Sequence, residues 1–199
     1  DPTATSLAGV SLAQLSIGVL GVLLVSNEYA TGMIRSTLAA VPTRLPVLWG
    51  KATVIALTTI VLCIPATVVA FLYGQSMLAR EQLDIAFGAP GVARAVIGSA
   101  LYLGVVGLLG LGLGALIRNT AGAISAVLGA LFGLQLVVSL LPVGWQDVVY
   151  KYLPSPAGLA VTGTRPDPDT LAPWAGFGVL CAYAAITLAL AAYRMRRSD

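Results

Sequence analysis

The chain contains no histidine and few charged residues. Its 199 residues include 11 basic and 8 acidic side chains, together 10% of the chain, whereas charged residues make up about 25% of an ordinary soluble domain. It also has no Ser/His/Asp set, no cluster of metal ligands, no paired-carboxylate site and no Walker A pattern. We therefore expect a chain that is not an enzyme and that binds no cofactor or metal itself.

Two further patterns are missing. The net charge is +3, yet the basic residues are scattered and no nucleic-acid-binding motif is present, so we expect no nucleic-acid partner. Cys63 and Cys181 are the two cysteines, and each lies in the middle of an apolar run, where a thiol behaves as a small apolar group. Two such cysteines indicate neither a disulfide framework nor a redox site.

What the sequence does contain is long uncharged runs. A helix needs roughly 20 apolar residues to cross a bilayer core about 30 Å thick. Five runs of about this length hold none of the 19 charged residues (11 basic plus 8 acidic), and they cover residues 7–26, 52–73, 95–117, 119–141 and 171–193. Helices are expected, because the runs lack the alternation of barrel strands. The sequence predicts an all-α, polytopic membrane protein in which residues 1–199 form a single transmembrane domain.

Basic residues are divided unevenly between alternate loops, and cytoplasmic loops are the ones that retain Lys and Arg. One set of loops holds seven of them: Arg35, Arg44, Lys51, Arg118, Arg194, Arg196 and Arg197. The other set holds four: Arg80, Arg94, Lys151 and Arg165. The sequence therefore predicts a multi-pass protein of the cell membrane. Residues 27–51, the turn at Arg118 and the C-terminal tail are expected in the cytoplasm, and the loop at 142–173 outside.

This orientation places the first residue outside the cell. The chain begins "DPTATS", with neither an initiator methionine nor a charged leader. We therefore expect at least one more span upstream, which would give a parent protein of six spans.

Small residues and one proline mark the spans. Gly110 and Gly114, and again Gly129 and Gly133, have the four-residue spacing that lets helix backbones approach closely, so we expect them to pack helices. The third and fourth spans are joined by "RNT" alone, which predicts a tight antiparallel hairpin. Pro65 lies in the middle of the second span, where it acts either as a hinge or as a static kink.

The predicted outer loop divides into two parts. "VGWQDVVYKY" has apolar residues at helical spacing and predicts a short helix lying on the membrane surface. The following "LPSPAGLAVTGTRPDPD" is rich in proline and glycine and predicts an irregular loop. The segment is then either an external lid or a passive connector, and the sequence leaves both open.

The polar segment "NEYATGMIRSTLAAVPTR" follows the first span. At 100° per residue, one face carries Ala30, Ile34, Thr37, Leu38 and Val41, whereas the opposite face carries polar residues. This predicts an amphipathic helix that stops at a proline. Such a helix either lies among lipid headgroups, with its basic residues on anionic lipid, or docks on a soluble partner.

The order of residues here resembles the permease subunits of the ABC-2 type (type-2 ABC exporter) family. In that family an acidic residue, a glycine four positions on, an amphipathic helix, a proline, an arginine and a glycine with a basic residue follow the second span. The corresponding residues are Glu28, Gly32, the stretch 34–41, Pro42, Arg44, and Gly50 with Lys51. The turn "LGALIRNTAGA", the outer segment "YLPSPAGLA" and the basic tail extend the resemblance over the whole chain, with the family's first span absent.

The resemblance implies a permease subunit that works with a separate ATP-binding subunit and a second permease subunit. ATP would be used by the partner, and the amphipathic segment would be the cytoplasmic coupling helix. Site residues follow by position: Glu28, Tyr29, Gly32 and Arg35 as contacts or pivots, and Arg44 and Lys51 at the membrane boundary. Two other hypotheses remain open at this point, a structural or assembly protein that binds only lipid and an ion-coupled secondary transporter.

Overall fold

The computed structural model describes residues 2–33, 44–81, 85–164 and 170–197, and these contain helices and no strand. Five helices are long and apolar enough to cross a membrane, which confirms the all-α prediction for the described residues. The long elements are α2 (Val10–Ala30), α4 (Arg44–Leu78), α5 (Val92–Ile117), α6 (Thr120–Leu128) with its continuation, and α10 (Pro173–Arg197). The short ones are α1 (Pro2–Ser6), η1 (Ala79–Glu81), η2 (Gly129–Gly133), α7 (Leu134–Val138), α8 (Val143–Tyr150), α9 (Pro154–Leu159) and η3 (Ala160–Thr162).

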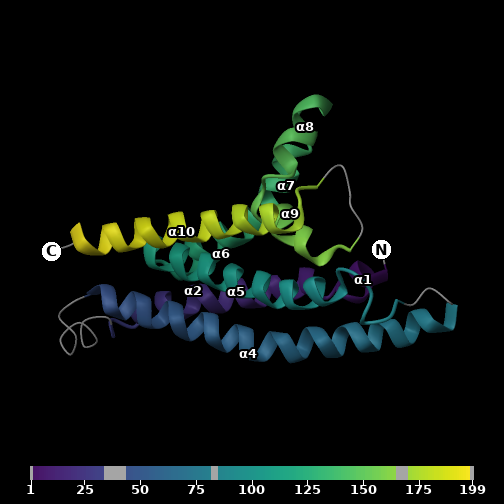
Figure 1. Ribbon diagram of the computed structural model, residues 1–199. Coiled ribbons are helices and arrows are strands. Elements are labelled where there is room, and N and C mark those ends of the chain that lie inside the picture. Colours follow the sequence, from purple (N-terminus) through teal and green to yellow (C-terminus); the bar gives the residue numbers. More distant parts are fainter. Residues whose placement is uncertain (1, 34–43, 82–84, 165–169, 198–199) are drawn as a thin grey trace.

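The long helices form a bundle around α5. Figure 1 shows α2, α4, α5 and α10 lying lengthwise beside one another. About 67% of the most apolar stretch of α5 is buried, against 22–39% for the other four candidate spans. The chain direction brings the ends of α2, α5 and α10 and the starts of α4 and α6 to one end of the bundle, here called the basic end. The other end, where the N-terminus lies, is the opposite end.

Glycines bring α2 and α5 into backbone contact. A Cβ added at Gly110 would overlap the carbonyl oxygen of Gly18, and one added at Gly21 would overlap that of Gly107. A Cβ at Gly114 would lie 2.9 Å from the carbonyl oxygen of Val22. In lipid, such close approach is a main source of helix association, because there is no hydrophobic force between helices. Gly110 and Gly114 therefore lie in the tightest contact of the bundle.

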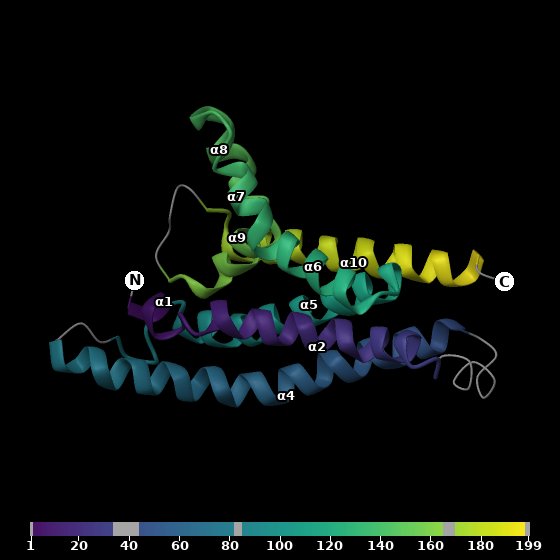
Figure 2. The ribbon, with the colours of Figure 1, turned by 180° about the vertical axis from the view of Figure 1, so that it is seen from behind.

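Helix α4 packs on α5 along a single stripe. Its buried residues recur every three or four positions: Leu48, Ala52, Ile55, Thr59, Cys63, Thr67, Phe71 and Gln75. At 1.5 Å per residue its 35 residues extend about 50 Å, well beyond a bilayer core of about 30 Å. Pro65 is exposed within it, and the helix continues through the proline as one bowed rod (Figures 1 and 2).

The fourth span leaves the bundle halfway along. It follows a hairpin in which Arg118 has φ 59° and the Asn119 side chain accepts a hydrogen bond from the Gly122 N–H, so the predicted neighbours α5 and α6 are indeed adjacent. After α6 the chain forms the π-helical segment η2, and α7 and α8 then project away from the other helices (Figure 2). The described residues make no close helix contact at Gly129 or Gly133, because no atom of another described element lies within 4 Å of a Cβ added at either position.

The loop predicted after residue 152 is wrong for residues 154–162. The structure has helix α9 and the 3-10 turn η3 there, and both are packed against α5 and α10. Pro154 opens α9, at the position where a missing N–H costs the helix nothing. Gly158 and Ala157 are buried, since small side chains let the segment enter the bundle. The helix predicted upstream is present as α8, and its placement on a membrane surface stays a prediction.

The α2–α5 contact predicts a strong difference between two glycine substitutions. Gly110→Ala places a methyl group against the α2 backbone and should destabilise the protein by roughly 1–3 kcal/mol. Gly178→Ala, in α10, meets no atom within 4 Å and should be neutral or slightly stabilising, because alanine favours helix by about 1 kcal/mol. Thermal unfolding of both purified variants in detergent checks this, and equal melting temperatures would contradict the contact.

Candidate functional site

The basic end is joined by an ion pair between α2 and α4. The Lys51 ammonium group, in the second turn of α4, lies 2.7 Å from Glu28 Oε1, in the last turn of α2. It also donates to the Leu24 carbonyl oxygen at 2.6 Å. The cation therefore lies beside the last two turns of α2, towards the negative end of the helix dipole. The pair links the two helices that flank residues 31–43.

Partial burial makes this pair stronger than a surface salt bridge. The side chains of Lys51 and Glu28 are 16% and 20% exposed, so water screens them less than an exposed pair. Glu28 Oε2 is buried and has no hydrogen-bond partner within the described residues. Removal of either partner would leave a poorly hydrated charge, which is the costly outcome for ion pairs of this kind.

Two cations extend these links to the other helices. The Arg118 guanidinium lies 5.4 Å from the ring centroid of Tyr29, within cation–π distance. Arg194, near the end of α10, donates to the carbonyl oxygen of Leu116 in the last turn of α5. Thus polar contacts connect α2 to α4, α2 to the α5–α6 hairpin, and α10 to α5. These non-covalent contacts join the helices at the basic end, so a displacement of one helix is passed on to the others.

The structure brings together some of the predicted site residues. Glu28 and Lys51 form the ion pair, and Tyr29 lies beside them on α2. Gly32 has φ 72° with open space around it and follows the last turn of α2, a common way for a helix to end. Arg44 is the first residue of α4. Arg35 and the stretch 34–41 lie outside the described residues.

The start of the predicted amphipathic helix needs correction. The prediction continued the helix through residues 30–33, but α2 ends at Ala30 and residues 31–33 form a bend and a turn. Glycine at position 32 permits the left-handed backbone that breaks the helix. The predicted coupling segment 27–51 also overlaps two helices. Its first residues belong to α2 and its last eight belong to α4.

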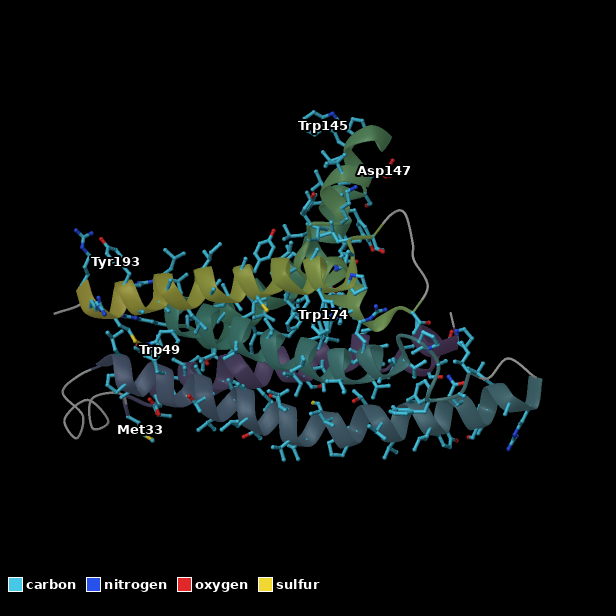
Figure 3. The ribbon with its side chains drawn as sticks, in the orientation of Figure 1. Met33, Trp49, Trp145, Asp147, Trp174 and Tyr193 are labelled. Atoms are coloured by element: carbon cyan, nitrogen blue, oxygen red, sulfur yellow. The ribbon has the colours of Figure 1, made fainter. Side chains whose placement is uncertain are left out.

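Aromatic side chains border the same end. Figure 3 shows Trp49 and Tyr193 at the basic end, and both are more than half exposed. Tryptophan and tyrosine favour the membrane–water boundary. Met33, 56% exposed, lies at the same end of the bundle and is the last residue described after α2. The polar contacts of the basic end therefore lie where a boundary between lipid and water would be expected.

A second polar cluster was not found from the sequence. Gln14 in α2, Tyr102 in α5 and Ser155 in α9 are each no more than 1% exposed and are joined by hydrogen bonds. The available signal was a glutamine and a tyrosine within apolar spans, since polar groups there need partners. The partner could not be identified, because 141 residues separate Gln14 from Ser155.

Two further observations concern ligand and metal binding. A hollow of about 270 Å³ beside α7 and α8 is lined by Gln135, Val138, Ser139, Gln146, Asp147 and Tyr150. Asp147 lies on the projecting α8, as Figure 3 shows. Among the described residues, no group of three acidic, cysteine or histidine side chains is placed to hold a metal ion.

The ion pair predicts a coupled loss of stability. Glu28→Gln or Lys51→Met alone should each destabilise the protein by about 1–3 kcal/mol, because each leaves a partly buried charge without its opposite charge. The double variant should lose less than the sum of the two single losses, since no unpaired charge remains. Thermal unfolding of the four proteins in one detergent measures the coupling. Strictly additive losses would show that the two residues do not interact.

No family model, no curated protein and no solved structure matches the chain.

Proposed function

We propose that the chain is the permease subunit of an ATP-driven exporter in a cell membrane. It supplies a path between its helices and those of a second permease subunit, whereas a separate ATP-binding subunit on the cytoplasmic side hydrolyses ATP. The chain itself catalyses no reaction and holds no cofactor. The basic end is then the cytoplasmic end.

The observation that carries this proposal is the Glu28–Lys51 ion pair. The pair joins the two helices on either side of residues 31–43, so a partner that presses on this predicted coupling segment would displace α2 and α4 together. A segment that only met lipid would need no such link between the two helices. Of the contact and pivot roles implied for Glu28, this geometry favours the pivot.

Helix α4 supports the transmission of such a displacement. It begins beside the ion pair and continues as one helix to Leu78, near the opposite end. There Gln75 donates to the Ser6 hydroxyl at 3.1 Å and accepts from the Ile85 N–H at 2.7 Å. A continuous helix that is held by polar contacts at both ends can pass a displacement from one end to the other. This is the requirement for coupling an event on one side of a membrane to an opening on the other.

The distribution of charge favours an external energy source. Within the described parts of the five candidate spans, acidic and basic side chains lie in the turns near the helix ends and not in the central turns. Ion-coupled carriers generally bind the coupling ion through ionisable groups inside the membrane. The secondary-transporter hypothesis therefore has no supporting residue in these spans, and ATP used by a partner is the better source.

Unpartnered apolar faces favour a second permease subunit. The outward side of α4, the projecting α7 and the turn that follows α7 expose large side chains, among them Val61, Leu62, Val69, Leu136 and Leu140, each 64–85% exposed. Lipid can cover such faces, but α7 and α8 leave their own bundle, and their larger contacts are with each other and with η2. Two copies placed side by side would cover the projecting helices and enclose a path that a single bundle around α5 lacks.

Co-purification tests the proposal. The chain, extracted in mild detergent from membranes of the cell that makes it, should retain a polypeptide with a Walker A motif and ATPase activity. Arg35→Glu, in the predicted coupling segment, should lower that retention by at least about tenfold, because reversed charge at an interface costs several kcal/mol. Mass spectrometry and ATP hydrolysis give the readouts.

The matched control is Arg80→Glu, since Arg80 is an exposed arginine at the opposite end. It should retain the ATP-binding polypeptide as the unchanged chain does. Recovery of lipid alone with the unchanged chain would refute the exporter proposal and favour the structural or assembly protein. Equal retention by both variants would refute the placement of the coupling segment.

A further inference from the structure

A polar hollow lies beside α7 and α8, the helices that project from the bundle. Its volume is about 270 Å³, and it is lined by Gln135, Val138, Ser139, Gln146, Asp147 and Tyr150. Pockets that hold drug-sized ligands usually measure about 300–1,000 Å³. This hollow therefore suits a smaller group.

The lining residues belong to one side of each helix. On a helix, positions 135, 138 and 139 share a side, and so do positions 146, 147 and 150. The large exposed apolar residues Leu136 and Leu140 fall on the other side of α7 and its following turn, as Trp145 and Val148 do on α8. The hollow is therefore separate from the apolar surfaces that lipid or a second subunit would cover.

Two glutamine side chains of the lining are oriented by the backbone. Gln135 donates from Nε2 to the Leu131 carbonyl oxygen at 2.6 Å, and Gln146 donates from Nε2 to the Ser139 carbonyl oxygen at 2.9 Å. A carbonyl group can only accept, so the bonded group of each amide must be its NH₂. Within the described residues, neither Oε1 atom has a hydrogen-bond partner. The two amides thus use donors on the backbone and keep acceptors for a ligand.

Asp147 gives the hollow a negative charge. Its side chain is exposed on α8, as Figure 3 shows. Lys151 follows one helical turn later, yet within the described residues Asp147 forms no ion pair with it. A carboxylate accompanied by two amide oxygens favours a cation that carries several N–H donors.

Other cations fit this set of groups less well. Ca²⁺ takes about 6–8 oxygen ligands, usually with several carboxylates, and the described residues contain no group of three acidic, cysteine or histidine side chains placed for a metal. A quaternary ammonium group is typically held by a cage of aromatic rings, whereas the described lining has Tyr150 alone. A primary ammonium group combines one positive charge with three N–H donors, which matches one carboxylate and two amide oxygens.

We infer that the hollow beside α7 and α8 binds a primary ammonium group, carried by a lipid headgroup or by a soluble amine. Asp147 supplies the opposite charge, and the amide oxygens of Gln135 and Gln146 accept the N–H donors. Binding of this group requires neither an ATPase nor export. The inference and the proposed function can therefore fail separately.

Lipid retention tests the site in the purified chain. Nanodiscs hold equal amounts of phosphatidylethanolamine and phosphatidylcholine with the same acyl chains, and native mass spectrometry counts the lipids that stay bound. The two ammonium groups carry the same charge, but only that of phosphatidylethanolamine has N–H donors. Retention should favour phosphatidylethanolamine roughly fivefold, because hydrogen bonds to a charged group are the stronger ones.

Two variants locate the preference. Asp147→Asn keeps the shape of an exposed side chain and removes its charge, so it should abolish the preference for phosphatidylethanolamine. Glu81→Gln is the matched control, since it makes the same change of charge in another element, η1. It should retain the preference of the unchanged chain.

A second measurement distinguishes the two sources of the ammonium group. Saturation-transfer NMR on the chain in phosphatidylcholine nanodiscs compares ethanolamine with choline, and transfer to ethanolamine should be greater unless Asp147 is replaced. A preference among the lipids alone assigns the group to a headgroup, whereas one in the NMR experiment alone assigns it to a soluble amine. The inference is overturned if neither experiment shows a preference, or if the Asp147→Asn protein shows the same preference as the unchanged chain.

Discussion

The backbone contact between α2 and α5 is the constraint on which the other contacts depend. Lipid gives helices no hydrophobic reason to associate, so close packing and polar contacts must supply the attraction. Glycines on both helices allow the backbones to touch. The contact fixes the height of α2 against α5, and that height sets Gln14 opposite Tyr102 and Tyr29 beside Arg118. A bulkier residue at the contact would therefore disturb both polar clusters, although neither lies at the glycines themselves.

The two polar clusters differ in the strength of their bonds. The Glu28–Lys51 pair combines opposite charges, a bond of 2.7 Å and partial burial, and Lys51 has the Leu24 carbonyl oxygen as a second partner. The bond from Ser155 to Gln14 is neutral and long. Charged hydrogen bonds are roughly twice as strong as neutral ones. The ion pair at the basic end is thus a stronger link than the hydrogen bond between Ser155 and Gln14.

The spans could be predicted from the sequence, because hydropathy is a local property. The first run was expected at 7–26 and the helix covers Val10–Ala30; three others agree similarly, whereas the second candidate span, Leu45–Leu78, extends beyond the expected 52–73 at both ends. The pairing of Glu28 with Lys51 and of Gln14 with Tyr102 and Ser155 could not, because it depends on how helices 23 to 141 residues apart in sequence face one another. The packed segment formed by α9 and η3 was missed for a different reason. Prolines and glycines that usually mark a loop here start a helix and let it approach its neighbours.

The uneven burial of the five helices indicates how the bundle could move. α5 is mostly enclosed, whereas α4 keeps one buried stripe and exposes the rest of its surface. That stripe contains Thr59, Cys63 and Thr67. Their side chains are small or weakly polar, so each buries less apolar surface than a large apolar side chain would. A helix held along one narrow stripe can rock against its support at a modest cost, provided that its ends are tied. Because both ends of α4 have polar ties, rocking would turn a displacement at Lys51 into one at Gln75, and α5 would remain the fixed element.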